Sequence, residues 1–490
     1  MRKLSIGSIA IALWLAGCTL EPQYHRPDAP VAASFSNGST YQAQTLKTGG
    51  KRSANGQAAS DIGWRNFFVD ARLQQLIKIA LINNRDLRVA VLNIEAARAQ
   101  YQITRAGFLP AVGAAASQNK QRIPADLSRT SQTVSDVYSV GLNASWEIDF
   151  FGRIRSLKDQ ALAQYLATSQ ARKAAELLLV SQVADQYLTM LAYDELLTVT
   201  QDTLNTAQGS YQLTQLKFDN GTGSELDLRQ AQTVVDQAQA NLQAQARARA
   251  QAENLLVLLI GEPLPSDLAP GANLDGQDLL EDIPAGLPSD LLSRRPDIME
   301  AEENLLAANA NIGAARAAFF PKVTLTGTFG TLSPSLGGLF KPGSAAWAFG
   351  PQISIPIFEG GTNLANLNLA EVRKKIQVAQ YERTIQGAFR DVSDGLTARG
   401  TYDREIAARQ RDTLAEQRRL ELSQLRYRGG VDSYLSVLTA QNDLYASRQS
   451  LITAQVQRLT SLVGLYRALG GGWIERSGEE PRPADAPGAG

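Results

Sequence analysis

Apolar residues at helical spacing run through most of the chain and predict unusually long helices. Residues 65–107 show this spacing until Phe108-Leu109-Pro110 ends it. The same spacing extends over residues 153–217 and 362–427, neither of which contains a proline. At about 1.5 Å per residue, ~65 helical residues reach ~100 Å, which indicates an elongated structure. Spacings of three and four along these helices predict coiled-coil seams, at Val180, Ala184, Tyr187 and Leu191 and at Leu459, Leu462, Tyr466 and Leu469.

Two stretches change to a period of two, which predicts β-strands. Between 111 and 151 the apolar residues that alternate with polar or small ones are Tyr138, Val140, Leu142, Ala144, Trp146 and Ile148. Residues 323–329 and 347–357 repeat the pattern, so each half of the chain supplies two strands, with polar loops near 120–135 and 333–345. Strands of this length with one apolar face suit a membrane β-barrel, although the edge of a soluble sandwich gives the same pattern. Four strands cannot close a barrel, so a membrane location requires oligomerisation.

The chain contains two tandem copies of one long unit. Asp86 and Pro110 recur as Asp297 and Pro321, in both cases 211 positions later. The turn after the first long helix, at 218–223, recurs at 427–430 with a shift of 209, as does Gly261 at Gly470. This period is too long for a solenoid repeat. A duplicated long element favours a pseudo-symmetric ring or tube over an enzyme with one pocket.

These boundaries predict the organisation of the whole chain. In each repeat a helix is followed by two strands, a long helix and a shorter helix that returns from a glycine turn. The expected divisions are a signal peptide at 1–17, an extended N-terminal segment at 18–64, the first repeat at 65–261, a proline-rich linker at 262–288, the second repeat at 289–470 and a tail at 471–490.

Composition excludes several classes of function. Lys+Arg and Asp+Glu balance at 48 each, so there is no basic excess to bind nucleic acid. The one histidine, His25, and the one cysteine leave little for catalysis or metal binding, and no phosphate loop, GxSxG motif or catalytic triad is present. The scattered carboxylates are expected to lie on solvated helix faces. We therefore expect neither enzyme activity nor a cofactor.

The N-terminus predicts export. Arg2 and Lys3 precede an apolar run over 9–16 that is too short to span a membrane. Leu15-Ala16-Gly17-Cys18 resembles the bacterial lipobox, which implies cleavage before Cys18 and attachment of acyl chains to it. Thr19 in place of Asp implies transfer to the outer membrane. The alternative is a chance cysteine in an ordinary signal peptide.

Long motifs along the mature chain resemble the TolC-like outer-membrane factors, and among them the OprM-type lipoprotein ducts of efflux pumps. The motifs that carry the resemblance are Asp61-Ile62-Gly63-Trp64-Arg65, Asn83-Asn84-Arg85-Asp86-Leu87, Leu226-Asp227-Leu228-Arg229-Gln230-Ala231-Gln232, Arg294-Arg295-Pro296-Asp297-Ile298, Gly313-Ala314-Ala315-Arg316-Ala317-Ala318-Phe319-Phe320-Pro321 and Ala468-Leu469-Gly470-Gly471-Gly472-Trp473.

The resemblance implies an α+β membrane protein. Three protomers with four strands each would close a twelve-stranded barrel, fused to a long α-helical barrel in the periplasm. The segments outside the repeats would form an equatorial domain around it. The duct would pass drugs and other amphiphiles passively, with a periplasmic adaptor and an inner-membrane resistance-nodulation-division pump as partners. The covalent lipid on Cys18 would be its only added group.

Two other functions remain open from the sequence. The exit duct of a type I protein-secretion system shares this architecture. A structural or adaptor coiled coil of the envelope is disfavoured, because it needs no barrel strands.

The resemblance also implies a gate at the helical turns. Asp227 in the first repeat, with Arg426 and Tyr427 in the second, corresponds to the links that hold the tip shut. Leu435 corresponds to an apolar constriction just inside the second tip. Relatives often carry carboxylates beyond this leucine, where this chain has Ser436 and Thr439. Asp432 in the turn is a substitute, or an Asp favoured by turn geometry alone.

Overall fold

The chain folds into two compact units, each built from parts of both repeats. The computed structural model describes residues 19–35, 57–122, 124, 134–280, 283–284 and 288–478. One unit comprises residues 1–28, 93–168 and 300–381, and the other comprises 29–92, 169–299 and 382–490. The boundaries of the repeats therefore do not coincide with the boundaries of the two units.

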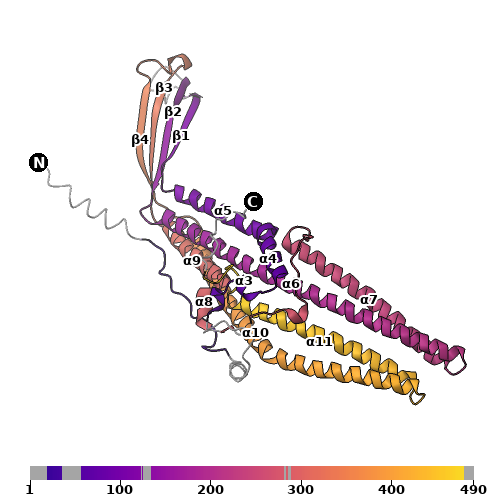
Figure 1. Ribbon diagram of the computed structural model, residues 1–490. Helices are drawn as coiled ribbons and strands as arrows, with labels where there is room; N and C mark the ends of the chain where they lie inside the picture. The colour runs from indigo at the N-terminus through magenta and orange to yellow at the C-terminus, as the bar shows by residue number, and fades with distance from the viewer. Residues whose placement is uncertain are drawn as a thin grey trace. The chain divides into compact units, whose positions relative to one another are not determined.

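The first unit contains a four-stranded antiparallel sheet with the strands in chain order (Figure 1). Its strands are β1 (Ala111–Arg122), β2 (Val134–Ile148), β3 (Lys322–Ser333) and β4 (Ala345–Ser354). Two strands from each repeat were predicted, and the structure has them. The last strand ends before the predicted position 357, at Ser354, which pairs with Lys322 at the start of β3. Strands β1 and β4 form the two edges of the sheet.

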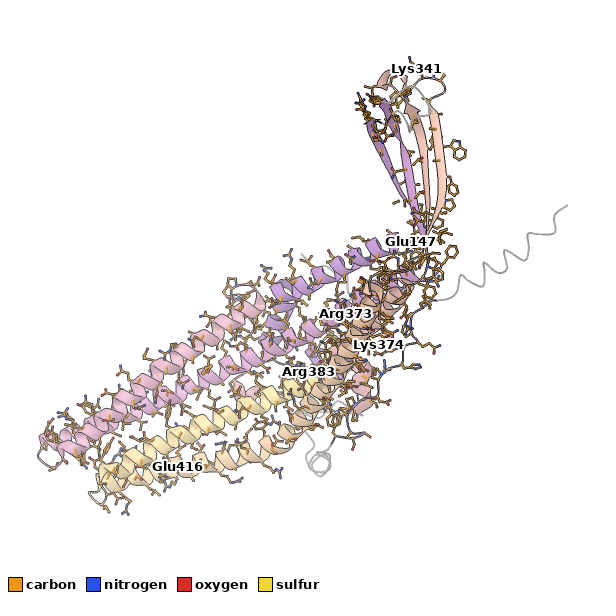
Figure 2. All side chains as sticks on the ribbon, turned by 180° about the vertical axis from the view of Figure 1, so that it is seen from behind. Glu147, Lys341, Arg373, Lys374, Arg383 and Glu416 are labelled. Atoms are coloured by element: carbon orange, nitrogen blue, oxygen red, sulfur yellow. The ribbon has the colours of Figure 1, made fainter. Side chains whose placement is uncertain are left out.

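The sheet has one apolar and one polar face, as the period of two predicts. Leu142, Phe329 and Trp347 lie side by side across three strands, and the last two are 67% and 77% exposed. On the opposite face, Asn143 pairs with Thr328 and Glu147 pairs with Thr324. Figure 2 shows Glu147 at one end of the sheet and Lys341 at the other. The large apolar side chains are uncovered within the part of the single chain that is described.

The prediction of one continuous helix over 65–107 is wrong, because three helices occupy this range. These are α3 (Trp64–Phe67), α4 (Ala71–Asn83) and α5 (Arg85–Ala106). The Asp70 carboxylate accepts the N–H groups of Arg72 and Leu73 and so starts α4. Asn84 has an extended backbone, with ψ 130°, and its side-chain oxygen accepts the N–H of Leu87 at 2.9 Å. Polar side chains at both breaks satisfy the free N–H groups of the next helix.

The two long helices extend close to their predicted ends. Helix α6 (Arg153–Asp219) and helix α10 (Thr362–Arg428) have 67 residues each. Helix α7 (Glu225–Ile260) returns beside α6, and α11 (Tyr434–Ala468) returns beside α10, so each repeat ends in a helical hairpin (Figure 1). The remaining helical elements are α8 (Leu291–Arg294), α9 (Pro296–Ala317), η1 (Ala59–Asp61), η2 (Leu274–Gly276), η3 (Pro288–Asp290) and η4 (Leu336–Gly338). No helix among the described residues combines the length and apolar character needed to cross a membrane.

Segments outside the repeats pack into the core of the second unit. The fully buried Tyr466 ring stacks on Phe67 at 4.0 Å, and its hydroxyl donates to the carbonyl of Ile62 at 2.5 Å. The other carboxylate oxygen of Asp70 accepts the Tyr187 hydroxyl, the Ala272 N–H and the Gln277 amide. One carboxylate therefore joins the start of α4, the middle of α6 and the linker between the repeats.

In both repeats the end of the returning helix packs on the start of the repeat through the same backbone contact. Gly261 and Gly470 end α7 and α11 with φ of +78° and +84°. A Cβ at either glycine would clash with a carbonyl oxygen, that of Asn83 or of Arg294. The next side chain then donates to the end of the returning helix, Asn84 to the Leu259 carbonyl at 2.8 Å and Arg295 to the Ala468 carbonyl at 3.2 Å. The sequence shifts of 211 and 209 relate these two contacts.

Alanine at Gly261 or Gly470 is expected to destabilise the second unit. The positive φ alone costs about 1–3 kcal/mol for a side chain, and the carbonyl clash adds to it. Gly464→Ala in α11 is the matched control, because its Cβ would meet no atom within 4 Å and a helical glycine gains about 0.5–1 kcal/mol on becoming alanine. Thermal unfolding of the purified protein, followed by circular dichroism, measures both effects. Equal melting temperatures for Gly470→Ala and Gly464→Ala would contradict the assigned closure.

Candidate gate at the helical tips

The two hairpins turn in the same backbone motif. At each tip a glycine with positive φ follows the long helix, Gly221 at +71° and Gly430 at +73°. The last turn of each long helix is closed by paired N–H donations, from Gly221 to Phe218 and Thr222 to Lys217 in the first tip, and from Gly430 to Tyr427 and Val431 to Arg426 in the second. This is a Schellman ending, which needs glycine at the left-handed position. The turns thus hold equivalent residues of the two repeats in equivalent places.

Lys217 and Tyr427 join the two hairpins. The Lys217 ammonium lies 3.9 Å from the centre of the Tyr427 ring, and it also donates to the Tyr427 carbonyl at 3.2 Å. Both groups lie in the last turns of their helices, α6 and α10. A cation above an aromatic face contributes about 0.5–1 kcal/mol at an exposed site and more when it is desolvated. This contact fastens the first tip to the second.

Tyr434 is the centre of a buried cluster at the second tip. Its ring is fully buried and meets the Tyr427 ring edge-on at 5.4 Å. Around it pack apolar residues of α7, α10 and α11, namely Ala231, Leu420, Val437, Ala440 and Leu444. Burial raises the pKa of the Tyr434 phenol to about 12, and the nearby Tyr427 hydroxyl and Asp227 carboxylate act in the same direction. The phenol is therefore neutral throughout the physiological pH range.

Arg426 and Asp432 form a two-bonded ion pair within the second tip. The guanidinium donates to both carboxylate oxygens, at 2.6 and 2.9 Å. This hydrogen-bonded guanidinium lowers the pKa of Asp432 below its ordinary value. The pair ties the end of α10 to the turn before α11, with Arg426 exposed and Asp432 partly exposed. It therefore stabilises the turn only modestly.

The other two predicted residues lie nearby but are not linked to this pair. Asp227 is in the first turn of α7 and makes no hydrogen bond or ion pair among the described residues, although its charge reaches Tyr434. Leu435 is in the first turn of α11 and is 53% exposed. The Thr439 hydroxyl donates to the Leu435 carbonyl at 2.9 Å. The structure thus brings Arg426, Tyr427 and Asp432 together and leaves Leu435 at the surface.

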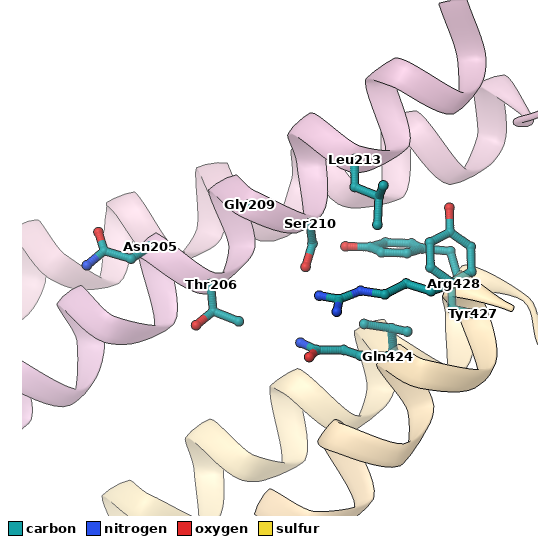
Figure 3. A pocket seen from close by; sticks show the side chains of 10 residues that line it. Asn205, Thr206, Gly209, Ser210, Leu213, Gln424, Tyr427 and Arg428 are labelled. Carbon is teal, nitrogen blue, oxygen red and sulfur yellow. The ribbon is translucent and has the colours of Figure 1, made fainter. Parts of the chain in front are cut away.

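A cavity lies between the two hairpins just behind the tips. Its volume is about 430 Å³, and its walls come from α6, α10 and α11. Figure 3 shows Ser210 and Leu213 of α6 facing Gln424, Tyr427 and Arg428 of α10. The full lining is Asn205, Thr206, Gly209, Ser210, Leu213, Gln424, Tyr427, Arg428, Tyr434 and Val437.

Sequence reasoning missed Lys217 and Tyr434. The signal for Lys217 was present, because it stands 209 positions before Arg426 and is therefore its counterpart in the first repeat. No such signal exists for Tyr434, since its counterpart is Glu225. Cys18, the predicted lipid site, lies outside the described residues. Within those residues no group of three or more His, Cys, Asp or Glu is placed to hold a metal ion.

Known proteins resemble the chain over nearly its whole length. The sequence model of the family described as "Outer membrane efflux protein" matches residues 76–262 and 287–471. The toluene efflux pump outer membrane protein TtgC of Pseudomonas putida is 47% identical over 99% of both chains. Outer membrane protein OprJ of Pseudomonas aeruginosa is 45% identical over 97% of this chain and 98% of its own. The open-state MtrE outer membrane channel of Neisseria gonorrhoeae superposes with a TM-score of 0.81 at 40% identity, covering 94% of this chain and all of MtrE.

These similarities test the main expectations from the sequence. The fold of four strands fused to long helices in two tandem repeats is confirmed, as is the resemblance to TolC-like channels. The protein is an outer-membrane channel for efflux, and the relatives above do not favour the secretion-duct alternative. The family is one of channel proteins. The chain belongs to the outer membrane efflux protein family.

Proposed function

We propose that three copies of this chain form the passive outer-membrane duct of a tripartite multidrug efflux pump. The duct receives drugs and other amphiphiles from a periplasmic adaptor and an inner-membrane resistance-nodulation-division pump, and it carries out no chemistry itself. The observation that carries the proposal is the four-stranded sheet with an apolar face and two open edges, continuous in sequence with the long helices. TtgC is named for toluene efflux, which supports an apolar cargo here.

The sheet edges support assembly of identical copies in a ring. An edge strand in hydrocarbon leaves N–H and C=O groups unpaired, at several kcal/mol each. Pairing β4 of one copy with β1 of the next satisfies both edges by one repeated contact. Such a head-to-tail contact closes a ring. Three copies of a four-stranded sheet give the twelve strands expected for this family.

The helices next to those edges carry matching apolar seams. Helix α5, which leads into β1, exposes Val89, Leu92, Ala96, Ala99 and Ile103 at spacings of three and four. Helix α10, which follows β4, exposes Ala365, Leu369, Val372, Ile376 and Ala379 at the same spacings. A seam of this kind buries itself against a second helix. We assign the α10 seam of one protomer to the α5 seam of the next.

The N-terminal strap, residues 19–26, runs along α9 and supports a lipid anchor on Cys18. Arg316 donates to the Leu20 carbonyl at 3.3 Å, Asn309 donates to the Pro22 carbonyl at 2.8 Å, and Arg26 pairs with Glu302 at 2.6 Å. The three residues of α9 are seven positions apart, two turns along one face. Thr19 therefore lies towards the end of α9 that precedes β3.

The segments outside the repeats would form the equatorial domain of the assembled duct. Backbone pairing between Trp64 and Ile474, at 2.9 Å, joins the N-terminal and C-terminal segments. Asp70 adds the linker between the repeats through Ala272 and Gln277. We propose that this domain comprises residues 18–64, 262–288 and 471–490.

The gate of this duct is assigned to the helical tips. Asp227, Arg426, Tyr427, Asp432 and Leu435 are its proposed residues, and Lys217 joins them because it links the two hairpins. The exposed ion pair and the cation above an aromatic ring are individually weak. Their loss would remove the exposed part of the closure, and the buried contacts that Ala231 and Leu213 of the first hairpin make with the Tyr434 cluster would remain to be separated.

Efflux should be restored by this chain in a bacterial host that lacks its own outer-membrane duct. Drug accumulation should fall only when the channel, an OprM-type adaptor and an inner-membrane pump are all present. Val372→Glu with Ile376→Glu should abolish the trimer and the efflux, because both side chains lie in the α10 seam. Lys375→Glu, on the same turn but outside the seam, is the matched control. A trimer in the outer membrane that restores no efflux would contradict the proposal.

Removing the link between the hairpins should open the channel. Lys217→Met deletes the cation above Tyr427 and should raise the open-to-closed ratio about three- to tenfold, and Asp227→Ala should raise it further. The open probability in single-channel recordings in planar bilayers gives this ratio. Arg418→Met is the control, because Arg418 pairs with Glu421 of its own helix. Equal open probabilities of Lys217→Met and Arg418→Met would rule out the link as part of the gate.

Acid should weaken the second tip through Asp432. Its depressed pKa means that the pair with Arg426 is intact above the ordinary Asp pKa of about 3.9 and is lost as the pH falls through the lower folded value. Asp432→Asn should raise the open-to-closed ratio at neutral pH about two- to fivefold, the range of an exposed pair. Bilayer recordings at neutral and acidic pH should show a smaller acid-induced increase in this variant. The same acid response in both proteins would exclude Asp432 as its source.

A further inference from the structure

The cavity between the hairpins has the size of a small-molecule site and is partly open to solvent. Its volume of about 430 Å³ falls within the usual range for ligand pockets, about 300–1,000 Å³. It is lined by α6 on one side and by α10 and α11 on the other, so an occupant would touch both repeats (Figure 3).

The lining divides into apolar and polar side chains, and both kinds come from α6 and from α10. Leu213, Val437 and the Tyr427 ring provide apolar and aromatic surface. Ser210 and Gln424 provide hydrogen-bonding groups. No Asp or Glu lines the cavity. A ligand with an apolar body and a polar end fits this division.

Arg428 is the one charged residue in the lining, and it lacks a carboxylate partner. Neighbouring arginines of α10 are paired, Arg426 with Asp432 and Arg419 with Asp443. Arg428 makes no hydrogen bond or ion pair within the described part of the chain, and Figure 3 shows its side chain beside the cavity. Its counterpart in the first repeat, Asp219, is already held by Gln215 at 2.7 Å. An unpaired guanidinium next to apolar walls attracts an anion.

We propose that this cavity binds a small organic anion that carries an aromatic or aliphatic body. The acid group pairs with Arg428, and the body packs against Tyr427, Leu213 and Val437. A simple inorganic anion would leave the apolar wall unfilled. Because the site touches both hairpins, and resting on the gate proposed above, an occupant joins them and favours the closed tip.

Binding is tested on the isolated full-length channel in amphipol, without adaptor or pump. Calorimetric titration compares naphthalenesulfonate with the uncharged naphthalenemethanol. The sulfonate should bind saturably and more tightly than the alcohol. Arg428→Gln should weaken sulfonate binding about tenfold or more and leave the alcohol unchanged. Arg418→Gln, which removes a paired arginine of the same helix, should bind as the unmodified protein does.

Gly209→Leu provides a second, steric test. Gly209 lines the cavity, and a side chain there would enter open space, since no atom lies within 4 Å of its Cβ position. Leucine in a helix interior does not impair folding, which the melting temperature checks. This variant should lose sulfonate binding while Arg428 remains. Unchanged binding in Arg428→Gln or Gly209→Leu, or equal binding of the two probes, would overturn the site. Efflux lost in variants that bind normally would assign the groove to a protein partner instead.

The consequence for gating is measured separately. In bilayers the sulfonate should lower the open fraction of the unmodified channel and have no effect on Gly209→Leu. Binding without this effect would retain the site and refute its regulatory role. Failure of the efflux assay would leave the binding result intact, so the two proposals fail independently.

Discussion

The unpaired edges of the sheet are the constraint on which the rest of the architecture depends. Within the described part of one chain, β1 and β4 each have a single neighbouring strand. Since lipid offers no substitute for missing backbone hydrogen bonds, an outer-membrane sheet with two open edges needs further copies. Helices α5 and α10 are continuous with the edge strands, and both carry exposed seams. In the proposed trimer, the same contact between copies would serve the sheet in lipid and the helices in water.

Duplication explains much of the fold, and departures from it are concentrated at the tips. Gly261 and Gly470 close their hairpins against equivalent backbone groups, because this contact is structural in both repeats. At the tips the equivalent positions differ in charge: Asp219 corresponds to Arg428, and Asp227 corresponds to Ser436. A contact between two hairpins cannot be made from identical surfaces of like charge. The divergence removes like charges at these positions, whereas the lysine of one tip and the tyrosine of the other meet from positions that keep their cationic and aromatic character in both repeats.

Local periodicity predicted the strands and long helices because their pattern is sustained over many residues. The breaks near Asp70 and Asn84 escaped it, because a capping side chain overrides a helical pattern that continues on both sides. Asn84 also donates to the Leu259 carbonyl, a contact between residues far apart in the sequence. The candidate gate likewise has a part that the sequence predicted and a part that it did not. The turn positions followed from glycines and the repeat, whereas the Lys217–Tyr427 contact and the cavity depend on how the two hairpins pack.

The proposed gate combines a buried cluster around Tyr434 with exposed contacts at the turns. Tyr434, Val437 and Ala440 are buried, so the second hairpin keeps its shape when exposed contacts break. The pair between Arg426 and Asp432 lies outside that cluster, and the Lys217 cation lies over Tyr427, which is a member of it; each of these two contacts is individually weak. In the proposed gate, opening would exchange the exposed contacts, for example for contacts with a partner protein, and would also separate Ala231 and Leu213 of the first hairpin from the buried cluster. Because a passive duct has no energy source of its own, the proposal depends on most of the closing contacts being exposed and individually weak.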